Sequence, residues 1–259
     1  MKKVFRNIVI VLVCTFCFTQ NVEAQWPKKS QNYFGFLFKP LIPFGIVGDR
    51  PFKIVDAELG NFETTISPTF GYTYGGAVRI GISDLLAIES GINYTRRNFR
   101  ADYDLPDSNV VASDEVGFVN FEIPLNFLVY IKLSERFYMN TSLGASANYN
   151  PSNIRSLTNP EGAHLFIFEG RRFRFFTYDV NANVGFEFRT EKKGFFYLGI
   201  SGKLPLVPAF QIATEYRNDV HSQVAYGRVE GATFAIDIKY FFHNSRKKGT
   251  QFKSGPIEQ

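Results

Sequence analysis

The side chains of this chain that could carry chemistry are charged residues placed among small ones. Arg79 is an example, with Ala77 and Gly81 two residues away on either side. Alternate residues of a strand share one face, and charges enclosed on such a face need partners of opposite sign. The pattern predicts a structural charge network with Arg189 as an accessory cation. Its expected members are Arg79, Glu89, Glu122, Asp179, Glu187, Lys203, Asp237 and Lys239.

Histidine chemistry is the second possibility. The three histidines are His164, His221 and His243, and no two of them have metal-ligand spacing. A phosphate-binding loop, a dinucleotide fingerprint, paired catalytic carboxylates and a zinc pattern are absent from the sequence. We therefore predict no enzymatic activity, no catalytic or metal-binding residue and no cofactor. A lipid-modifying enzyme that uses His164 or His221 in external loops is an alternative.

A run of basic residues, Arg171-Arg172-Phe173-Arg174, offers a third kind of chemistry. Guanidinium groups bind phosphate in a bidentate manner, so this run could hold the phosphates of lipopolysaccharide. The simpler interpretation, which we favour, is a basic rim near an anionic lipid leaflet.

These residues must be positioned by strands, because large apolar side chains recur at every second position. The clearest copy is the segment from Gly71 to Ile82. A period of two is typical of β-strands. The pattern predicts strands near 33–43, 68–82, 85–97, 117–131, 137–149, 173–189, 195–206 and 231–242.

The connections between these strands alternate in length. Three are short and polar, whereas the segments 44–67, 98–116, 150–172 and 207–230 are long. An even strand number with short periplasmic turns and long external loops is typical of bacterial outer-membrane barrels. We therefore predict an all-β fold, an eight-stranded antiparallel up-and-down transmembrane β-barrel with both termini in the periplasm.

Side-chain volume decides which face of the strands points outward. An eight-stranded barrel encloses only enough space for side chains to fill, so the large face, which includes Phe127 and Val184, must contact lipid. The small polar face then lines the lumen, with Arg79 opposite Glu89. A filled lumen with paired charges is favoured, and a narrow channel for ions or small solutes is the alternative.

Aromatic and apolar residues also gather outside the strand centres. Phe137, Tyr138, Phe195 to Tyr197 and Tyr240 to Phe242 lie near strand ends, which predicts an interfacial girdle. The long loops contain apolar residues that either fold over the barrel mouth or contact a partner. These are Phe52, Ile54, Val55, Val110, Val111, Leu165, Phe166, Ile167, Phe168, Val207, Phe210 and Ile212.

The two ends of the chain indicate an exported protein. Lys2, Lys3 and Arg6 precede an apolar run from Ile8 to Phe18, and Ala24 ends a cleavage motif, so residues 1–24 are predicted to be a signal peptide. Both cysteines lie within that segment, which leaves no disulfide. Residues 25–32 form a short N-terminal segment, 33–242 the barrel and 243–259 a polar basic periplasmic tail. The chain's net charge of +5 is small, and we expect no nucleic-acid partner.

Two motifs resemble a known family. One is Gly81-Ile82-Ser83-Asp84-Leu85-Leu86-Ala87-Ile88-Glu89-Ser90-Gly91-Ile92-Asn93-Tyr94, and the other is Phe121-Glu122-Ile123-Pro124-Leu125. Together they resemble the PorT-like outer-membrane β-barrel family of Bacteroidota, over roughly residues 33–242. Many members have no known activity, and the namesake works in the type IX secretion apparatus. Barrels of this type often end at a C-terminal aromatic residue, whereas 17 residues follow Phe242 here.

We therefore expect a monomer in the bacterial outer membrane with a structural or interaction role. The resemblance implies that this role is tied to protein secretion. The expected partners are outer-membrane lipid and lipopolysaccharide, together with secretion-apparatus or periplasmic proteins.

Overall fold

The computed structural model describes residues 32–43, 49–56, 61–83, 85–106, 109–159, 162, 164–190, 193–218 and 222–243. Its regular elements are all β-strands. Within this part of the chain, no helix is long and apolar enough to cross a membrane. The predicted signal peptide, nearly all of the 25–32 segment and all of the C-terminal tail after His243 lie outside the described residues.

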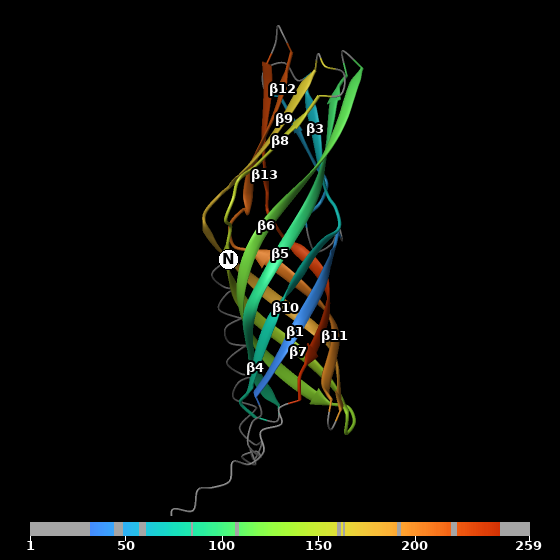
Figure 1. The fold of residues 1–259 in the computed structure, drawn as a ribbon, viewed down its shortest axis with the longest axis vertical. Helices are drawn as coiled ribbons and strands as arrows, with labels where there is room; N and C mark the ends of the chain where they lie inside the picture. The colour runs from blue at the N-terminus through green and yellow to red at the C-terminus, as the bar shows by residue number, and fades with distance from the viewer. Residues whose placement is uncertain are drawn as a thin grey trace, which may run out of the picture.

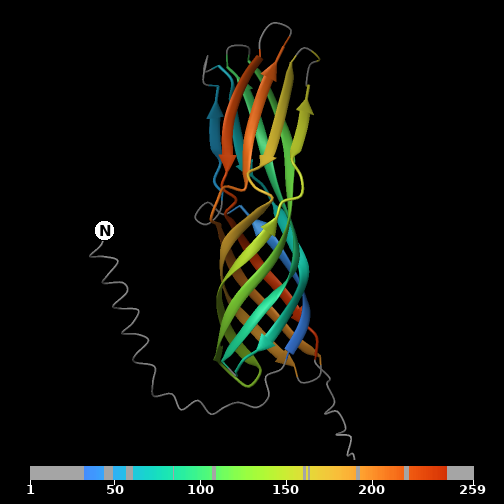
Figure 2. The ribbon, with the colours of Figure 1, turned by 90° about the vertical axis from the view of Figure 1, so that its left-hand side faces the viewer.

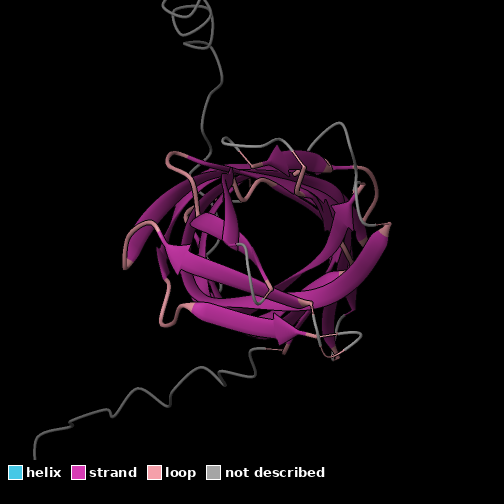
Figure 3. Ribbon diagram, turned by 90° about the horizontal axis from the view of Figure 1, so that it is seen from above, coloured by secondary structure: helices cyan, strands magenta, loops and turns pink. Residues whose placement is uncertain are grey.

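Eight strands close into a barrel in the lower half of the molecule (Figures 1 and 2). They are β1 (Asn32–Ile42), β4 (Gly71–Gly81), β5 (Leu86–Leu105), β6 (Val110–Lys132), β7 (Phe137–Tyr149), β10 (Phe176–Thr190), β11 (Gly194–Pro205) and β14 (Thr233–Phe241). Each pairs antiparallel with its neighbour in that order, and β14 pairs back onto β1 through Gly35 and Phe241. The ring is visible from above (Figure 3). The predicted eight-stranded antiparallel barrel is confirmed.

Short turns join the strands at the end of the barrel where β1 begins and β14 ends. The hydroxyl of Ser83 accepts hydrogen bonds from the backbone N–H groups of Leu85 and Leu86, and Ser134 does the same for Phe137. Serine in a turn favours this local bonding because its hydroxyl replaces a backbone acceptor. These polar turns fix the register of the hairpins that they close.

The outer face of the barrel is a belt of large apolar side chains. Ile92, Phe127, Leu143 and Leu198 are among the most exposed, with 58 to 66% of their surface accessible. Arg79, Glu89 and Asp237 on the opposite face are at most 3% accessible. The prediction from side-chain volume is therefore confirmed: the large residues face outward and the charged ones line the lumen.

The four long segments between the barrel strands are not loops, which corrects the sequence prediction. They contain β2 (Phe52–Val55), β3 (Glu63–Pro68), β8 (Ile154–Thr158), β9 (Leu165–Arg172), β12 (Phe210–Arg217) and β13 (Ser222–Val229). The hairpin of β5 and β6 continues upward to a turn near Asn109, so most of the predicted 98–116 loop is strand. We call this upper region, residues 49–68, 98–117, 150–172 and 207–231, the cap (Figure 2).

The cap has the opposite polarity to the barrel. Along β5 the buried side chains between Glu89 and Arg97 are charged or polar, and those from Phe99 onward are apolar. Strands β2, β3, β5 and β6 face the four-stranded sheet β13-β12-β9-β8 across an apolar core. The apolar loop residues Ile54, Phe166, Phe168, Phe210 and Ile212 lie in this core. Of the two alternatives, they fold over the barrel mouth, while Val55 and Val111 stay exposed.

The barrel and cap meet at a waist where two connecting segments are hydrogen-bonded together. The Asp49 carboxylate accepts the backbone N–H of Gly231, at 2.9 and 3.1 Å, and Arg97 Nη1 donates to the Gly231 carbonyl at 2.7 Å. Gly231 has φ of +90°, which favours glycine. Burial raises the pKa of Asp49 above its usual range, although Arg97 opposes this effect.

Candidate functional site in the barrel lumen

The lower lumen is centred on Arg79, whose side chain is 2% accessible. The register places Arg79 of β4 directly opposite Glu89 of β5, and Arg79 Nη2 lies 2.6 Å from Glu89 Oε2. Its Nη1 lies 2.5 Å from Glu187 Oε2 on β10, across the lumen. The other oxygen of Glu187 accepts a hydrogen bond from Arg189. One guanidinium therefore joins strands from two sides of the barrel.

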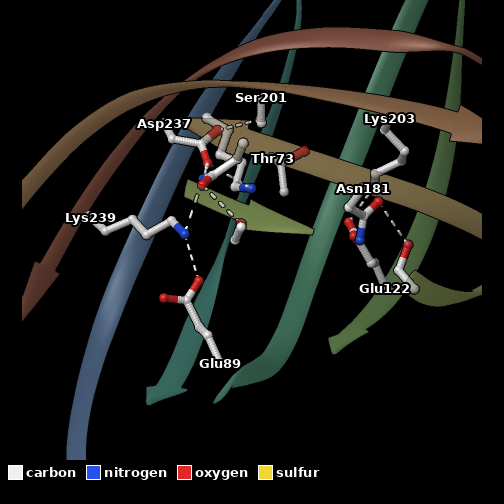
Figure 4. Close-up of polar contacts among 12 residues, drawn as sticks. Thr73, Glu89, Glu122, Asn181, Ser201, Lys203, Asp237 and Lys239 are labelled. Carbon is white, nitrogen blue, oxygen red and sulfur yellow. Dashed lines mark hydrogen bonds and ion pairs between the residues drawn. The ribbon is translucent and has the colours of Figure 1, made fainter. Parts of the chain in front are cut away.

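The network continues upward through two lysines. Lys239 Nζ lies 2.5 Å from Glu89 Oε1 and 3.9 Å from Asp237 Oδ2. Lys39 Nζ lies 3.1 Å from the same Asp237 oxygen. Ser201 donates to the other Asp237 oxygen, so this carboxylate is held from several strands (Figure 4).

A second group of charges lies higher in the lumen. Lys203 Nζ is 2.6 Å from Glu122 Oε2 and 3.9 Å from Asp179 Oδ2. The ion pairs of the described lumen thus join five cations to five carboxylates. The cations are Lys39, Arg79, Arg189, Lys203 and Lys239, and the carboxylates are Glu89, Glu122, Asp179, Glu187 and Asp237.

The structure thus brings all eight proposed network residues into one enclosed lumen, in two groups. Sequence reasoning missed Lys39, which stands between Phe38 and Pro40. Lys39 lies two residues after Leu37 and four after Gly35, so strand alternation places it on the same inward face and could have identified it. Burying charge is costly unless each ion is paired, and the equal numbers of cations and carboxylates meet that condition.

An aromatic cluster closes the lower end of the lumen. Phe195 stacks on Phe241 at 4.7 Å and meets Tyr33 edge-on at 4.8 Å. The Arg79 guanidinium lies over Phe241 at 4.2 Å, a favourable cation–π distance. This corrects the prediction that all the aromatics at this rim form a girdle. Strand alternation sends Phe195, Tyr197 and Phe241 inward, whereas Phe196, Tyr240 and Phe242 face outward.

The cap core closes the upper end. Phe118 of β6 contacts Phe210 of β12 with their rings 3.9 Å apart, directly above the polar layer. A cavity of about 30 Å³ beside Lys203 and one of about 10 Å³ beside Asp179 lie in the described lumen, each with room for one or two water molecules. Asp179 and Asn120 line the smaller one. The lumen is therefore filled along its length.

The other predicted chemistry lies elsewhere. His164 Nδ1 is 2.8 Å from the Tyr216 hydroxyl in the cap, His243 follows β14, and His221 lies outside the described residues. Among the residues that the structure describes, no three His, Cys, Asp or Glu side chains are grouped to hold a metal. The arginine run from Arg171 to Arg174 joins β9 to the segment before β10.

The fold and the lumen define a class: an eight-stranded antiparallel β-barrel with an apolar outer belt, a filled charged lumen and a β-structured cap. Among solved structures, the chain is similar to the outer membrane protein OprG from Pseudomonas aeruginosa. That match has 11% identity, a TM-score of 0.49, and covers 85% of this chain and 99% of OprG. A second match is the COG4313 outer membrane channel from Pseudomonas putida F1, with 9% identity, a TM-score of 0.24 and coverage of 86% and 98%. No family model and no curated protein matches the sequence.

Proposed function

We propose that this protein is an integral outer-membrane β-barrel with a sealed lumen and a structural or interaction role. The observation that carries the proposal is the combination of an apolar belt outside with a lumen of paired charges inside. In water the belt would expose an apolar surface far larger than soluble proteins tolerate. In lipid a closed barrel satisfies every backbone group of its spanning strands.

The height of the belt supports this placement. On β10, outward residues from Phe176 to Phe188 are apolar, and this stretch measures about 40 Å along the strand at about 3.3 Å per residue. A tilt of about 45° reduces it to about 28 Å, close to the hydrocarbon thickness of a bilayer. The turns at the lower end then lie in the periplasm together with both ends of the barrel, and the cap projects outward.

A sealed lumen distinguishes this proposal from the channel alternative. The aromatic cluster at Phe195 and Phe241 and the cap core close the two ends of the described lumen, and the cavities between them at Lys203 and Asp179 are of water size. We expect the purified protein to insert into planar bilayers without stepwise conductance. F195A/F241A, which removes two rings from the lower closure, is the positive control for detection. Stepwise conductance of the unaltered protein would favour the channel.

We further propose that the protein is not an enzyme. His164 contacts Tyr216 within the cap and has no carboxylate partner among the described residues. Alanine replacement of His164 and His221 is expected to leave the lipid A and phospholipid profiles of the cell unchanged. A changed profile would instead support the lipid-modifying alternative.

The resemblance to the PorT-like family supports a more specific proposal, an association with the protein-secretion apparatus. We propose the cap and the tail after His243, which the sequence predicts to be periplasmic, as the regions that make such contacts. Cross-linking followed by co-purification from cells tests this association. Recovery of secretion-apparatus subunits with the full chain, and their loss when residues 244–259 are removed, is the expected result.

A further inference from the structure

The segment from Arg171 to Phe176 lies where the cap meets the barrel. β9 ends at Arg172 and β10 begins at Phe176, which pairs with Tyr149 of β7. Arg174 is two residues from Phe176, so the two Cα atoms are at most about 7 Å apart. Phe176 and Tyr149 are exposed on the outer belt, with their rings 5.4 Å apart. The arginines therefore lie at the upper edge of the belt.

The backbone of this segment is held rigidly by its neighbours. Asn150 donates two hydrogen bonds to this segment. Its backbone N–H donates to the Phe175 carbonyl at 2.8 Å, and its side-chain amide donates to the Arg174 carbonyl at 3.2 Å. The Phe173 N–H donates to the Ala209 carbonyl at 3.2 Å. With the backbone fixed, binding a ligand costs side-chain entropy but little additional backbone entropy.

The segment is strongly cationic. Arg171 is 72% accessible and shares Glu169 with Arg155, at 3.2 and 3.5 Å. Arg174 is exposed, and no carboxylate in the described part of the chain forms an ion pair with it. Arg155, Arg171, Arg172 and Arg174 thus outnumber Glu169, while Glu215, which lines the same hollow as Arg171, is paired with Arg217. The surface has an excess of positive charge at the height of lipid headgroups.

Exposed aromatic rings lie beside these cations. Phe173 and Phe175 are 39% and 52% accessible. The Arg172 guanidinium lies 3.7 Å from the centre of the Phe175 ring, and its Nη1 donates to the Pro151 carbonyl at 2.7 Å. Arg174 lies over Phe173 at 5.8 Å. Beside the exposed outer-belt rings of Tyr149 and Phe176, a cation with an exposed ring beneath it suits the boundary between acyl chains and headgroups.

We propose that Arg171 and Arg174 bind the phosphate groups of a phosphorylated glycolipid in the outer leaflet. Their guanidinium groups contact the phosphates in a bidentate manner, while Phe173 and Phe175 contact the first carbons of the acyl chains. Arg172 is a positioning residue because its guanidinium is used on Phe175 and Pro151. The inference rests on the proposed membrane location and identifies the lipid chemistry that this location meets.

The test uses the full mature chain in detergent micelles, with lipid A as the probe and native mass spectrometry as the measurement. R171Q/R174Q is compared with R217Q, which changes an exposed arginine at the far end of β12. We expect the double variant to lower lipid A binding on the order of tenfold, and R217Q to leave it unchanged. Lipid A without phosphates should bind the unaltered protein as weakly as intact lipid A binds R171Q/R174Q. R174Q alone is the second variant if the double one does not fold, and a several-fold loss is expected from it.

Three results would overturn the inference. They are equal lipid A binding by R171Q/R174Q and the unaltered protein, an equal loss in R217Q, and complete displacement of lipid A by millimolar inorganic phosphate. Insertion into lipid vesicles is measured separately for each protein. Failure of the unaltered protein to insert would contradict the membrane location itself, whereas insertion with unchanged lipid preference would contradict only the phosphate site.

Discussion

At the residue scale, Arg79 shows how a buried charge can organise this barrel. Its guanidinium contacts Glu89 and Glu187 and stacks on Phe241, so it belongs both to the charge network and to the lower closure. A buried ion pair contributes little net stability, but removing one partner leaves the other charge buried and unpaired. Removing Arg79 should therefore lower the stability of the fold much more than removing an exposed arginine.

Arg79→Ala is therefore expected to lower the free energy of unfolding by about 3–5 kcal/mol. Arg100→Ala is the matched control because Arg100 pairs with Asp102 on the cap surface, where both side chains are about half exposed. An exposed pair contributes about 0–1 kcal/mol. Urea titration of the refolded barrel, followed by heat-modifiable gel mobility, measures both. Equal losses would mean that Arg79 is not part of an enclosed network.

The ionisation of Asp49 should make the stability of the waist depend on pH. Burial raises its pKa above the ordinary value of 3.8, so the folded state binds the proton more tightly than the unfolded chain. The stabilisation that comes from this tighter proton binding is complete below the pKa of Asp49 in the unfolded chain. It disappears as the pH rises through the pKa of Asp49 in the folded protein. The protection factor of amides near Gly231, in which the rise of the intrinsic exchange rate with pH is already corrected, should therefore fall over that rise. Asp49→Asn, which stays neutral, should flatten this profile, and an unchanged profile would exclude Asp49 as its source.

At the element scale, each barrel strand has one outward apolar face, which we propose contacts lipid, and one face toward the lumen. β6 offers a direct comparison, because Phe127 faces outward and its neighbour Asn126 faces the lumen. Lysine at Phe127, near mid-bilayer, should cost about 2–4 kcal/mol. Lysine at Asn126 should cost less because it enters a polar environment. Folding titrations into lipid vesicles measure both, and the reverse order would indicate that the apolar face is inside.

One physical reason explains why the cap strands were not predicted from the sequence. A barrel strand shows large apolar residues outside and small polar ones inside. In the cap, β12 has mostly polar residues outside, whereas β9 has apolar residues on both faces, with Leu165 and Ile167 outside. Their alternation is short and is interrupted at the waist by residues such as Pro68 and Pro208. The same segments therefore resemble loops when compared with the long barrel strands. The apolar residues of these segments indicated that the segments pack against something. They did not show whether the packing is within the chain or against a partner.

The barrel strands themselves were predictable because successive side chains of a strand point to opposite faces, and here one face is large and apolar and the other small and polar. The pairing of Arg79 with Glu89 follows from one tight turn, so it could be expected from the sequence. The cross-lumen contact of Arg79 with Glu187 could not, because strands separated by 108 residues meet only after closure of the ring. Closure also brings Phe195 and Phe241, which strand alternation turns inward, under the Arg79 guanidinium.

At the scale of the whole molecule, the barrel and the cap have separate cores. The barrel has a charged lumen with small apolar clusters near its lower end, whereas the cap has one large aromatic core containing Phe62, Tyr103, Phe166 and Tyr216. Cores that share few contacts can unfold in separate steps. The cap should therefore lose structure before the barrel does.

Phe166→Ala tests this separation. Phe166 is fully buried and its ring contacts those of Phe62, Tyr103 and Tyr216, so the truncation should cost about 3–5 kcal/mol within the cap. Hydrogen exchange of the protein in lipid should show lost protection in β9 and β12 but unchanged protection in β7 and β10. Leu157→Ala, at an exposed cap position, is the control and should change neither. Equal loss of protection in the barrel would show instead that barrel and cap fold as one cooperative unit.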